Sequence, residues 1–234
     1  DTGFRVWRTR HATIGAGMRS DPAGVEGRRA YGDWKCGAAW QPLWELAASA
    51  LRELRVDRVA ALPIEGWFES LLAGAGYQPA DAVIFFEREL TRSIPTSSQR
   101  SRPIQGEDER ALLELDHLAF EPLWQLSSDS LRAALIQSDS ATIIESAGAL
   151  AGYQITTRSP LGAHLARLAV HPGHRRRGLG RSLVLEALQS ARQGGLSRLS
   201  VNTQADNLAS QRLYRSLGFR ETGQHYRVLE TRLP

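Results

Sequence analysis

The sequence predicts an α+β (mixed α/β) fold in which a mixed, mostly antiparallel sheet is flanked by helices. Several segments repeat apolar residues at helical spacing, and the short apolar runs between them are typical of buried strands. In the second half, these segments follow the order strand, two helices, several strands, helix, strand, helix and strand. A length of 234 residues allows one large domain or two small ones.

The composition is that of an ordinary globular protein, with 42% hydrophobic and 23% charged residues. No apolar run approaches the ~20 residues of a membrane-spanning helix, and the first residues lack the pattern of a signal peptide. We therefore expect a cytoplasmic protein with no membrane partner. The single cysteine, Cys36, allows no internal disulfide and no cysteine-based metal cluster, so no metal is expected.

The positive charge comes almost entirely from arginine, because Lys35 is the only lysine and the net charge is +4. Guanidinium groups bind phosphate through two parallel hydrogen bonds, which favours a phosphate-bearing ligand. The arginines are scattered along the sequence and form no long stripe. They support nucleic-acid binding only weakly, and we expect no nucleic-acid partner.

A polar segment bounded by prolines divides the chain. Residues 93–103 include Pro95 and Pro103 and lack any apolar period, which is typical of a linker. We therefore expect an N-terminal domain over 1–92, a linker over 93–102 and a C-terminal domain over 103–234.

Each half contains its own series of predicted elements. In the first half, the pattern predicts helices over 43–54 and 67–72 and strands over 58–62 and 82–86. In the second half, the predicted helices are 107–119, 128–137, 179–191 and 208–217, and the predicted strands are 141–145, 151–157, 164–170, 198–201 and 226–229. Residues 1–34 give no clear pattern.

The helix–strand–helix–strand order of the first half recurs at the end of the chain, which indicates an internal repeat. Gly76 then corresponds to Gly218, and Leu72 corresponds to Tyr214. Residues 38–42 stand in the first copy where the second copy has a basic, glycine-containing turn. The first copy is therefore interpreted as a degenerate half that keeps the fold and lacks the chemistry.

That turn is the most informative segment of the chain. An apolar run ends at Pro172, and arginines 175–177 lead through two glycines into a helix. Unpaired N–H groups and the positive end of the helix dipole make such a turn an anion site. Gly178 and Gly180 carry no Cβ and allow a phosphate to approach the backbone closely. Alternatively, the turn is only a solvated basic cap of the helix.

Two motifs of the second half resemble those of the GNAT superfamily of acyl-coenzyme A-dependent N-acyltransferases. The family pattern Gln/Arg-x-x-Gly-x-Gly/Ala is matched by Arg175, Gly178 and Gly180. The pattern Asn-x-x-Ala/Ser-x-x-x-Tyr-x-x-x-Gly-Phe is matched by Asn207, Ser210, Tyr214, Gly218 and Phe219. The resemblance runs from Arg102 to the end and is strongest to N-terminal acetyltransferases of ribosomal-protein type. The first half resembles a degenerate GNAT domain.

The resemblance implies the GNAT fold, in which the fourth and fifth strands (here 164–170 and 198–201) splay apart and admit pantetheine between them. It implies acetyl-coenzyme A as the acyl donor. The implied donor-binding residues are Leu168, Ala169, Val170, Arg175, Arg176, Arg177, Gly178, Leu179, Gly180, Arg181, Asn207, Ser210 and Tyr214. Backbone amides of the first three would orient the thioester carbonyl in the manner of an oxyanion hole.

The resemblance also implies direct attack of an amine on the thioester, since Cys36 lies far from the motifs and a covalent acyl-enzyme is not favoured. Tyr214 matches the family tyrosine whose hydroxyl protonates the leaving thiolate. The alternative for Tyr214 is a core aromatic. Asn207 has the alternative of a plain helix cap.

The proton acceptor is where the sequence departs from the ribosomal-protein type. Those enzymes carry a glutamate where this chain has Asn202, which argues against a ribosomal-protein substrate. His164 lies where histone-type members carry their base, and a histidine is suited to proton transfer near neutral pH, directly or through water. The alternative is a strand-end histidine without a role. Glu145 and Tyr153 are the fallback candidates.

The predicted function is transfer of an acetyl group from acetyl-coenzyme A to a primary amine, either a protein N-terminus or a small molecule. Phe120, Trp124 and His117 could line the acceptor pocket or belong to the core. A non-catalytic acyl-coenzyme A sensor and a nucleic-acid-associated protein are the alternatives. We expect a monomer or a homodimer. The degenerate half could pack where a second subunit would, and this would favour the monomer.

Overall fold

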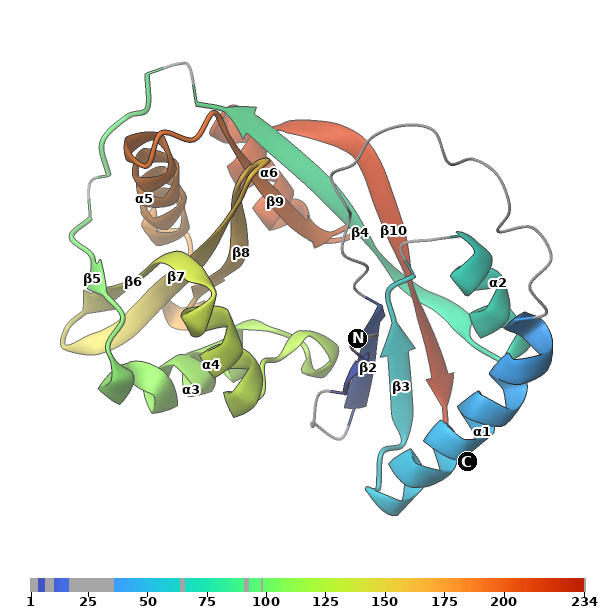
Figure 1. Cartoon of the computed structure of the whole chain (residues 1–234). Coiled ribbons are helices and arrows are strands. Elements are labelled where there is room, and N and C mark those ends of the chain that lie inside the picture. Colours follow the sequence, from blue (N-terminus) through green and yellow to red (C-terminus); the bar gives the residue numbers. More distant parts are fainter. Residues whose placement is uncertain are drawn as a thin grey trace. The chain divides into compact units, whose positions relative to one another are not determined.

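The structure is a computed structural model that describes residues 4–6, 11–16, 36–63, 66–90, 93–97 and 99–233. It divides into two compact units (Figure 1). Unit 1 comprises Asp1–Asp81 and Tyr226–Pro234, and unit 2 comprises Ala82–His225. Within the described part of the chain, no helix is both long enough and apolar enough to cross a membrane.

Unit 2 is built on a mixed sheet with the strand order β4-β9-β8-β7-β6-β5. The pairs are antiparallel except for β8 and β9, which run parallel. The strands are β4 (Gln78–Glu89), β5 (Arg102–Pro103), β6 (Ser138–Ser146), β7 (Ala149–Ser159), β8 (Gly162–Val170) and β9 (Arg198–Gln204). This arrangement confirms the predicted mixed, mostly antiparallel sheet.

Helices cover both faces of this sheet (Figure 1). On one face, α3 (Glu109–Ala119) and α4 (Ser128–Ile136) pack through Leu112 and Leu131 against Ile143 and Ile155 of the sheet. On the other face, α5 (Leu179–Gln193) and α6 (Leu208–Ser216) share a core with β4, β8 and β9. Short 3-10 turns, η1 (Gly106–Asp108), η2 (Pro122–Trp124) and η3 (Pro172–His174), complete the unit.

The parallel strands β8 and β9 separate part of the way along their length. Their pairing runs from Ala163 opposite Leu199 to Leu165 opposite Val201 and stops there. Strand β8 continues to Val170, still paired with β7 on its other side, after a register shift between β7 and β8. Within the described part of the chain, the far part of β8 therefore has one edge without a strand partner, as the predicted splay requires.

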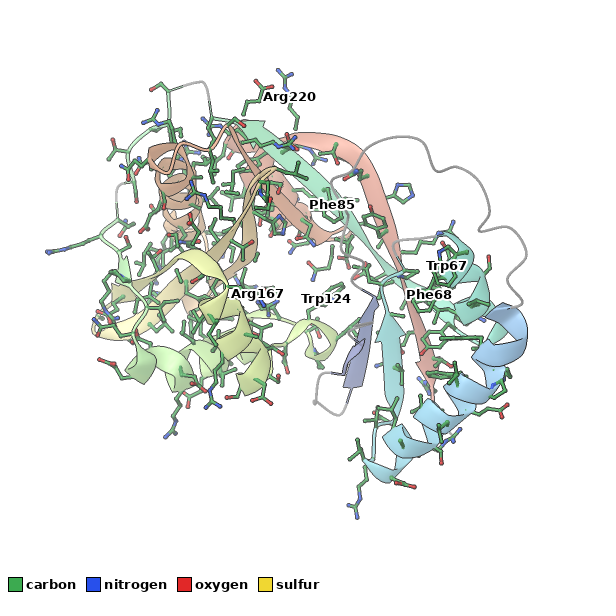
Figure 2. The ribbon with its side chains drawn as sticks, viewed as in Figure 1. Trp67, Phe68, Phe85, Trp124, Arg167 and Arg220 are labelled. Carbon is green, nitrogen blue, oxygen red and sulfur yellow. The ribbon has the colours of Figure 1, made fainter. Side chains whose placement is uncertain are left out.

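Unit 1 combines α1 (Cys36–Glu53), β3 (Arg58–Ala61), α2 (Gly66–Gly74), β1 (Phe4–Val6) and β2 (His11–Ala16) with the end of β10 (Arg220–Arg232). Strand β3 pairs in parallel with β2 and antiparallel with β10. Trp44, Phe68, Leu72 and Tyr77 form its core. Trp67 and Phe68 extend from α2 (Figure 2).

The last strand of each half of the sequence pairs with a strand from the other half. Strand β4 follows α2, yet its residues 83–89 pair with β9 in unit 2. Strand β10 follows α6, yet its residues 229–232 pair with β3 in unit 1. The two compact units are consequently not delimited at 92 and 103, and the domain division made from the sequence stays a prediction.

Several element boundaries differ from the predictions. The first helix begins at Cys36 and not at Leu43, because Trp40, Trp44 and Ala48 lie one turn apart and face the core. Residues 38–42 therefore lie inside a helix that contains Pro42. Strands β4 and β10 are longer than predicted at both ends, since their outer residues are polar and give no apolar signal.

Candidate active site

The basic turn between β8 and α5 has the backbone of an anion site. Arg176 and Gly178 adopt left-handed conformations, with φ of 61° and 83°, and Gly178 precedes the first residue of α5. The space where a Cβ of Gly178 would lie is open. Glycine is favoured at this position because the backbone has a positive φ, and not because a side chain would clash. The N–H groups of the first turn of α5 have no partner within the helix and lie at the positive end of its dipole.

A cleft of about 650 Å³ opens at this turn, and eleven of the thirteen predicted donor-binding residues line it. They are Leu168, Ala169, Val170, Arg175, Arg176, Gly178, Leu179, Gly180, Arg181, Asn207 and Ser210. Arg177 and Tyr214 are not among its lining residues. A Cβ on Gly180 would lie 3.4 Å from Leu213 of α6, at ordinary van der Waals distance. We call this space the donor cleft.

The arginines of the turn differ in their contacts. The guanidinium of Arg175 donates to the carbonyl of Ala119 at 3.2 Å and approaches that of Val170 at 3.5 Å. Arg176, Arg177 and Arg181 are exposed, and no ion pair involves them within the described part of the chain. Three guanidinium groups thus remain available for an anionic ligand.

The unpaired edge of β8 presents backbone donors to the donor cleft. The N–H of His171 donates to the carbonyl of Ala151 in β7. Because neighbouring residues of a strand point their N–H groups to opposite edges, Ala169 also faces β7, and Leu168 and Val170 face the open edge. Of the three amides that the sequence pointed to, these last two are free to bind a ligand.

A second pocket of about 100 Å³ lies between the separated ends of β8 and β9. It is lined by Tyr214, by Asn202 and Gln204 of β9, by Arg167 of β8, and by Trp124. It shares Phe120, Leu168, Asn207 and Ser210 with the donor cleft. We call this space the acceptor pocket.

Tyr214 is held with its ring in the core and lines the acceptor pocket. Its side chain packs against Phe86 of β4 and Phe219, with ring centroids 6.0 and 5.7 Å away. Burial raises the pKa of the phenol above its ordinary value, and a hydrogen bond with Ser210 opposes this in part. The hydroxyl therefore stays protonated at neutral pH and can donate a proton. Asn207 caps α6 by accepting the N–H of Ser210 at 3.1 Å.

His164 does not line the acceptor pocket. It lies opposite Ser200 in the paired part of β8 and β9, with Nδ1 2.9 Å from the hydroxyl of Ser200. Burial lowers the pKa of the imidazole, and a hydrogen bond with Asn202 opposes this in part. Asn202 lines the pocket and His164 does not. The structure therefore does not bring His164 and Tyr214 together on the pocket wall.

The fallback candidates lie away from both spaces. Glu145 forms an ion pair with Arg102 beside the outer strand β5. Tyr153 is buried and donates to Asp116, and burial raises the pKa of its hydroxyl. The side chain of Cys36 lies outside the described residues. In the part of the chain that is described, no cluster of three or more metal-ligating side chains occurs.

Sequence reasoning missed a buried ion pair behind the acceptor pocket. Arg167 donates two hydrogen bonds to Asp116, each of 2.8 Å, and a third to the carbonyl of Trp124. Its guanidinium carbon also lies 3.5 Å from the ring centre of Phe120. Through these contacts, the ion pair holds Phe120 and Trp124 in place on the wall of the acceptor pocket. The available signal was Asp116 itself, four residues after Leu112 on the buried face of its helix.

Comparison with known proteins matches the model of the acetyltransferase (GNAT) family to residues 109–219. The matched segment contains both motifs, the turn of the donor cleft and Tyr214. Residues 109–219 of this chain are therefore similar to the acetyltransferase (GNAT) family.

Two kinds of curated relatives illustrate the range of similarity. A mycothiol acetyltransferase of Thermobispora bispora is 32% identical over 169 residues, which cover 64% of this chain and 57% of that protein. The N-alpha-acetyltransferase RimI of Mycobacterium tuberculosis is 40% identical over 90 residues, which cover 36% of this chain and 55% of that protein. The chain thus spans little more than half the length of these relatives.

Solved structures share the fold at low sequence identity. A GCN5-related N-acetyltransferase from Sphaerobacter thermophilus aligns with a TM-score of 0.66 and 16% identity, over 97% of this chain and 75% of that one. A tandem GNAT protein from the clavulanic acid biosynthesis pathway aligns with a TM-score of 0.60 and 17% identity, over 96% of this chain and 76% of that one. These likenesses establish the fold.

Proposed function

We propose that the chain is an N-acetyltransferase that transfers an acetyl group from acetyl-coenzyme A to a primary amine by direct attack. The observation that carries the proposal is the shared wall of the donor cleft and the acceptor pocket, formed by Phe120, Leu168, Asn207 and Ser210. A donor lying in one space and an amine in the other would meet there. Bringing two reactants together in this way removes much of the entropic barrier to their reaction.

The donor cleft suits the chemistry of coenzyme A. Its pyrophosphate would bind the turn at Gly178, where backbone N–H groups and exposed guanidinium groups converge. The pantetheine arm carries amide groups, and the free N–H groups of Leu168 and Val170 are complementary to them. One of these donors would also polarise the thioester carbonyl.

The proposed transfer replaces the C–S bond of the thioester by the C–N bond of an amide. The lone pair of the amine forms a bond to the carbonyl carbon, and the C–S bond breaks. The hydroxyl of Tyr214 gives its proton to the leaving thiolate, and the surplus proton of the new amide nitrogen restores the tyrosine through solvent. His164 remains the proposed base: from its position it would take this surplus proton through a water molecule and release it to the solvent that restores the tyrosine.

The acceptor is proposed to be a protein N-terminus or a small-molecule amine. The names of the relatives support both, since one is a mycothiol acetyltransferase and another is an N-alpha-acetyltransferase. We further propose that the protein acts in the cytoplasm, as a monomer or a homodimer. The first half is proposed to be a degenerate GNAT domain.

The test combines a binding measurement with a turnover measurement. Acetyl-coenzyme A should raise the melting temperature, because a ligand that binds only the native state stabilises it. A panel of amines should then show release of free thiol in the presence of at least one acceptor. Binding without turnover on any amine would favour the alternative, a non-catalytic acyl-coenzyme A sensor. The absence of any thermal shift would contradict both functions.

A further inference from the structure

A short segment after α3 contributes to the walls of both the donor cleft and the acceptor pocket. We call residues 120–126, which include η2, the wall segment. Phe120 lines both spaces, whereas Trp124 lines the acceptor pocket and not the donor cleft. The acceptor pocket, with about 100 Å³, has roughly the volume of three water molecules. Even a small shift of the wall segment therefore changes which amines the pocket can admit.

Two arginines, one before and one after the open edge of β8, bind the backbone at the wall segment. The guanidinium of Arg175 donates to the carbonyl of Ala119, the last residue of α3, at 3.2 Å. The guanidinium of Arg167 donates to the carbonyl of Trp124 at 2.7 Å. Its carbon atom also lies 3.5 Å from the ring centre of Phe120, in the cation–π contact that arginine forms with aromatic rings. Arg167 therefore contacts both aromatic residues of the wall segment.

Asp116 of α3 holds the guanidinium of Arg167 in one orientation. Its carboxylate accepts from Nε and Nη2 of Arg167 at 2.8 Å each, and this fork fixes the plane of the guanidinium. The carboxylate also accepts from the hydroxyl of Tyr153 at 2.5 Å and from the N–H of Leu126, in the wall segment, at 2.8 Å. Burial raises the pKa of the Tyr153 hydroxyl, which therefore remains a donor. These four hydrogen bonds occupy the acceptor positions of the carboxylate.

Stability alone does not explain a charged network at this place. The side chain of Asp116 has no exposed surface, and that of Arg167 is only 14% exposed. Taking two charges out of water is costly, and apolar side chains of similar volume often stabilise a protein as well as such a pair does. Apolar side chains cannot supply a directed hydrogen bond to the carbonyl of Trp124. The network therefore indicates a role in fixing the wall segment at the acceptor pocket.

We propose that Arg167 is a positioning residue that sets the size of the acceptor pocket, and that Asp116 and Tyr153 orient Arg167 for this task. The proposal rests on the proposed function. With the wall segment fixed beside β8, the acceptor is an amine whose substituents next to the reacting nitrogen are small. One additional methyl group at that place should lower kcat/KM by about 10-fold or more, because a fixed apolar wall cannot make room for it.

The position of the wall segment is tested by fluorine NMR on protein labelled with 5-fluorotryptophan. Trp124 is the only tryptophan after position 67, and Trp124→Phe identifies its signal by loss. Asp116→Asn combined with Arg167→Met removes both charges and leaves neither unpaired. In this double variant, we expect the signal of Trp124 to show a larger difference between H₂O and D₂O, because the released indole becomes more exposed.

The matched control removes another ion pair of the same helix. Arg132 of α4 pairs with Glu109 of α3 at 2.8 Å, and neither residue lines the acceptor pocket. Glu109→Gln combined with Arg132→Met should leave the signal of Trp124 unchanged. An equally unchanged signal after Asp116→Asn with Arg167→Met would overturn the proposal, because Arg167 would then not hold the wall segment.

The consequence for the acceptor is tested with the panel amine of highest turnover and with its analogue that carries one more methyl group beside the nitrogen. We expect the unmodified protein to favour the smaller amine by about 10-fold or more in kcat/KM. The Asp116→Asn, Arg167→Met variant should show a KM for the smaller amine raised by about 10-fold or more, with unchanged affinity for coenzyme A. Its preference between the two amines should fall toward one. Arg167→Lys should retain part of the preference, since lysine keeps the positive charge and one donor.

A purely structural ion pair gives a different result. It would leave KM and the size preference unchanged in any variant that stays folded, and this outcome would overturn the proposal, as would equal rates on both amines in the unmodified protein. If the double variant does not fold, Arg167→Lys and Tyr153→Phe carry the same test with smaller effects. Turnover on no amine of the panel would instead contradict the proposed function, whereas the fluorine NMR would still decide whether Arg167 holds the wall segment.

Discussion

Two corners where a helix turns into a strand have the same backbone in the two halves of the chain. After α2, the N–H of Tyr77 donates to the carbonyl of Leu72 at 3.1 Å, and the intervening Gly76 has a φ of 85°. After α6, the N–H of Phe219 donates to Tyr214 at 3.1 Å, and Gly218 has a φ of 81°. The left-handed glycine ends each helix in the same way.

The two corners differ in the side chain one turn before the glycine. Leu72 is fully buried in the aromatic core of unit 1. Tyr214 occupies the same place in unit 2 and lines the acceptor pocket. The corner therefore requires only a glycine and a buried side chain, and the phenol of Tyr214 in place of the aliphatic Leu72 separates a candidate catalytic corner from a structural one. This supports the proposal that the first half keeps the fold without the chemistry.

The segments before the first long helix of each half differ more. Arg176 and Gly178 form a left-handed turn ahead of α5, with exposed side chains and unpaired N–H groups. Residues 38–42, which stand at the corresponding place of the first half, lie within α1. None of these five residues is an arginine or a glycine, and none has a positive φ. We therefore expect one donor site in the chain.

The largest effect is expected at the corner that carries the hydroxyl. Tyr214→Phe should lower kcat by about 10²- to 10⁴-fold, because the thiolate loses its proton donor. Affinity for coenzyme A should stay unchanged. The comparison is Tyr77→Phe, whose buried hydroxyl has no partner within the described residues and whose loss should leave turnover intact. If both variants lost turnover equally, as measured by thiol release, the proposed difference between the Tyr214 hydroxyl and the Tyr77 hydroxyl would be wrong.

The donor turn and the Tyr214 corner could be predicted from sequence because their signals are local. The pairing of β9 with β4 could not be predicted from the sequence. Phe86 of β4 packs on Tyr214, although 128 positions separate them in the chain, and the sequence placed the strand of Phe86 in the other domain. The position of His164 also depends on the register of two parallel strands, which no periodicity reveals. The same holds for the pairing of Asp116 with Arg167, which joins a helix to a strand.

The packing of β4 against Tyr214 provides a second test. Phe86→Ala should destabilise the protein by about 3–5 kcal/mol, since it removes a fully buried ring. It should also lower kcat of the remaining folded protein, because Tyr214 loses a neighbour. Phe68→Ala in unit 1 should cost similar stability with unchanged kcat. Denaturant unfolding and turnover of both variants below their transitions distinguish these outcomes, and unchanged kcat in Phe86→Ala would show that β4 does not support the tyrosine.

The glycines offer a smaller and cleaner contrast. Gly178→Ala and Gly76→Ala both place a Cβ at positive φ, which should cost each variant about 1–2 kcal/mol of stability. Only Gly178→Ala should weaken coenzyme A binding, since only that glycine lies in the donor cleft. Calorimetric titration of both variants checks this. Equal affinities would show that the turn is a solvated cap of α5 and no anion site.

The smallest expected effect concerns pH. Burial holds the pKa of His164 in the folded protein below its ordinary value of about 6.5, so the unfolded chain binds more protons as the pH falls toward and below that value. The histidine therefore contributes stability above about pH 6.5 that is lost on acidification. His164→Gln should flatten this loss in unfolding free energies measured between pH 7 and pH 5. An unchanged slope would show that His164 titrates in the folded protein as it does in the unfolded chain.

The measurement that tests the central claim most directly is a calorimetric titration of the chain with acetyl-coenzyme A. One site per chain is expected, because among the described residues only the turn at Gly178 combines a left-handed backbone with the open edge of β8. Weaker binding in Gly178→Ala, with unchanged binding in Gly76→Ala, would locate the site in unit 2. Two sites per chain, or none, would contradict the account.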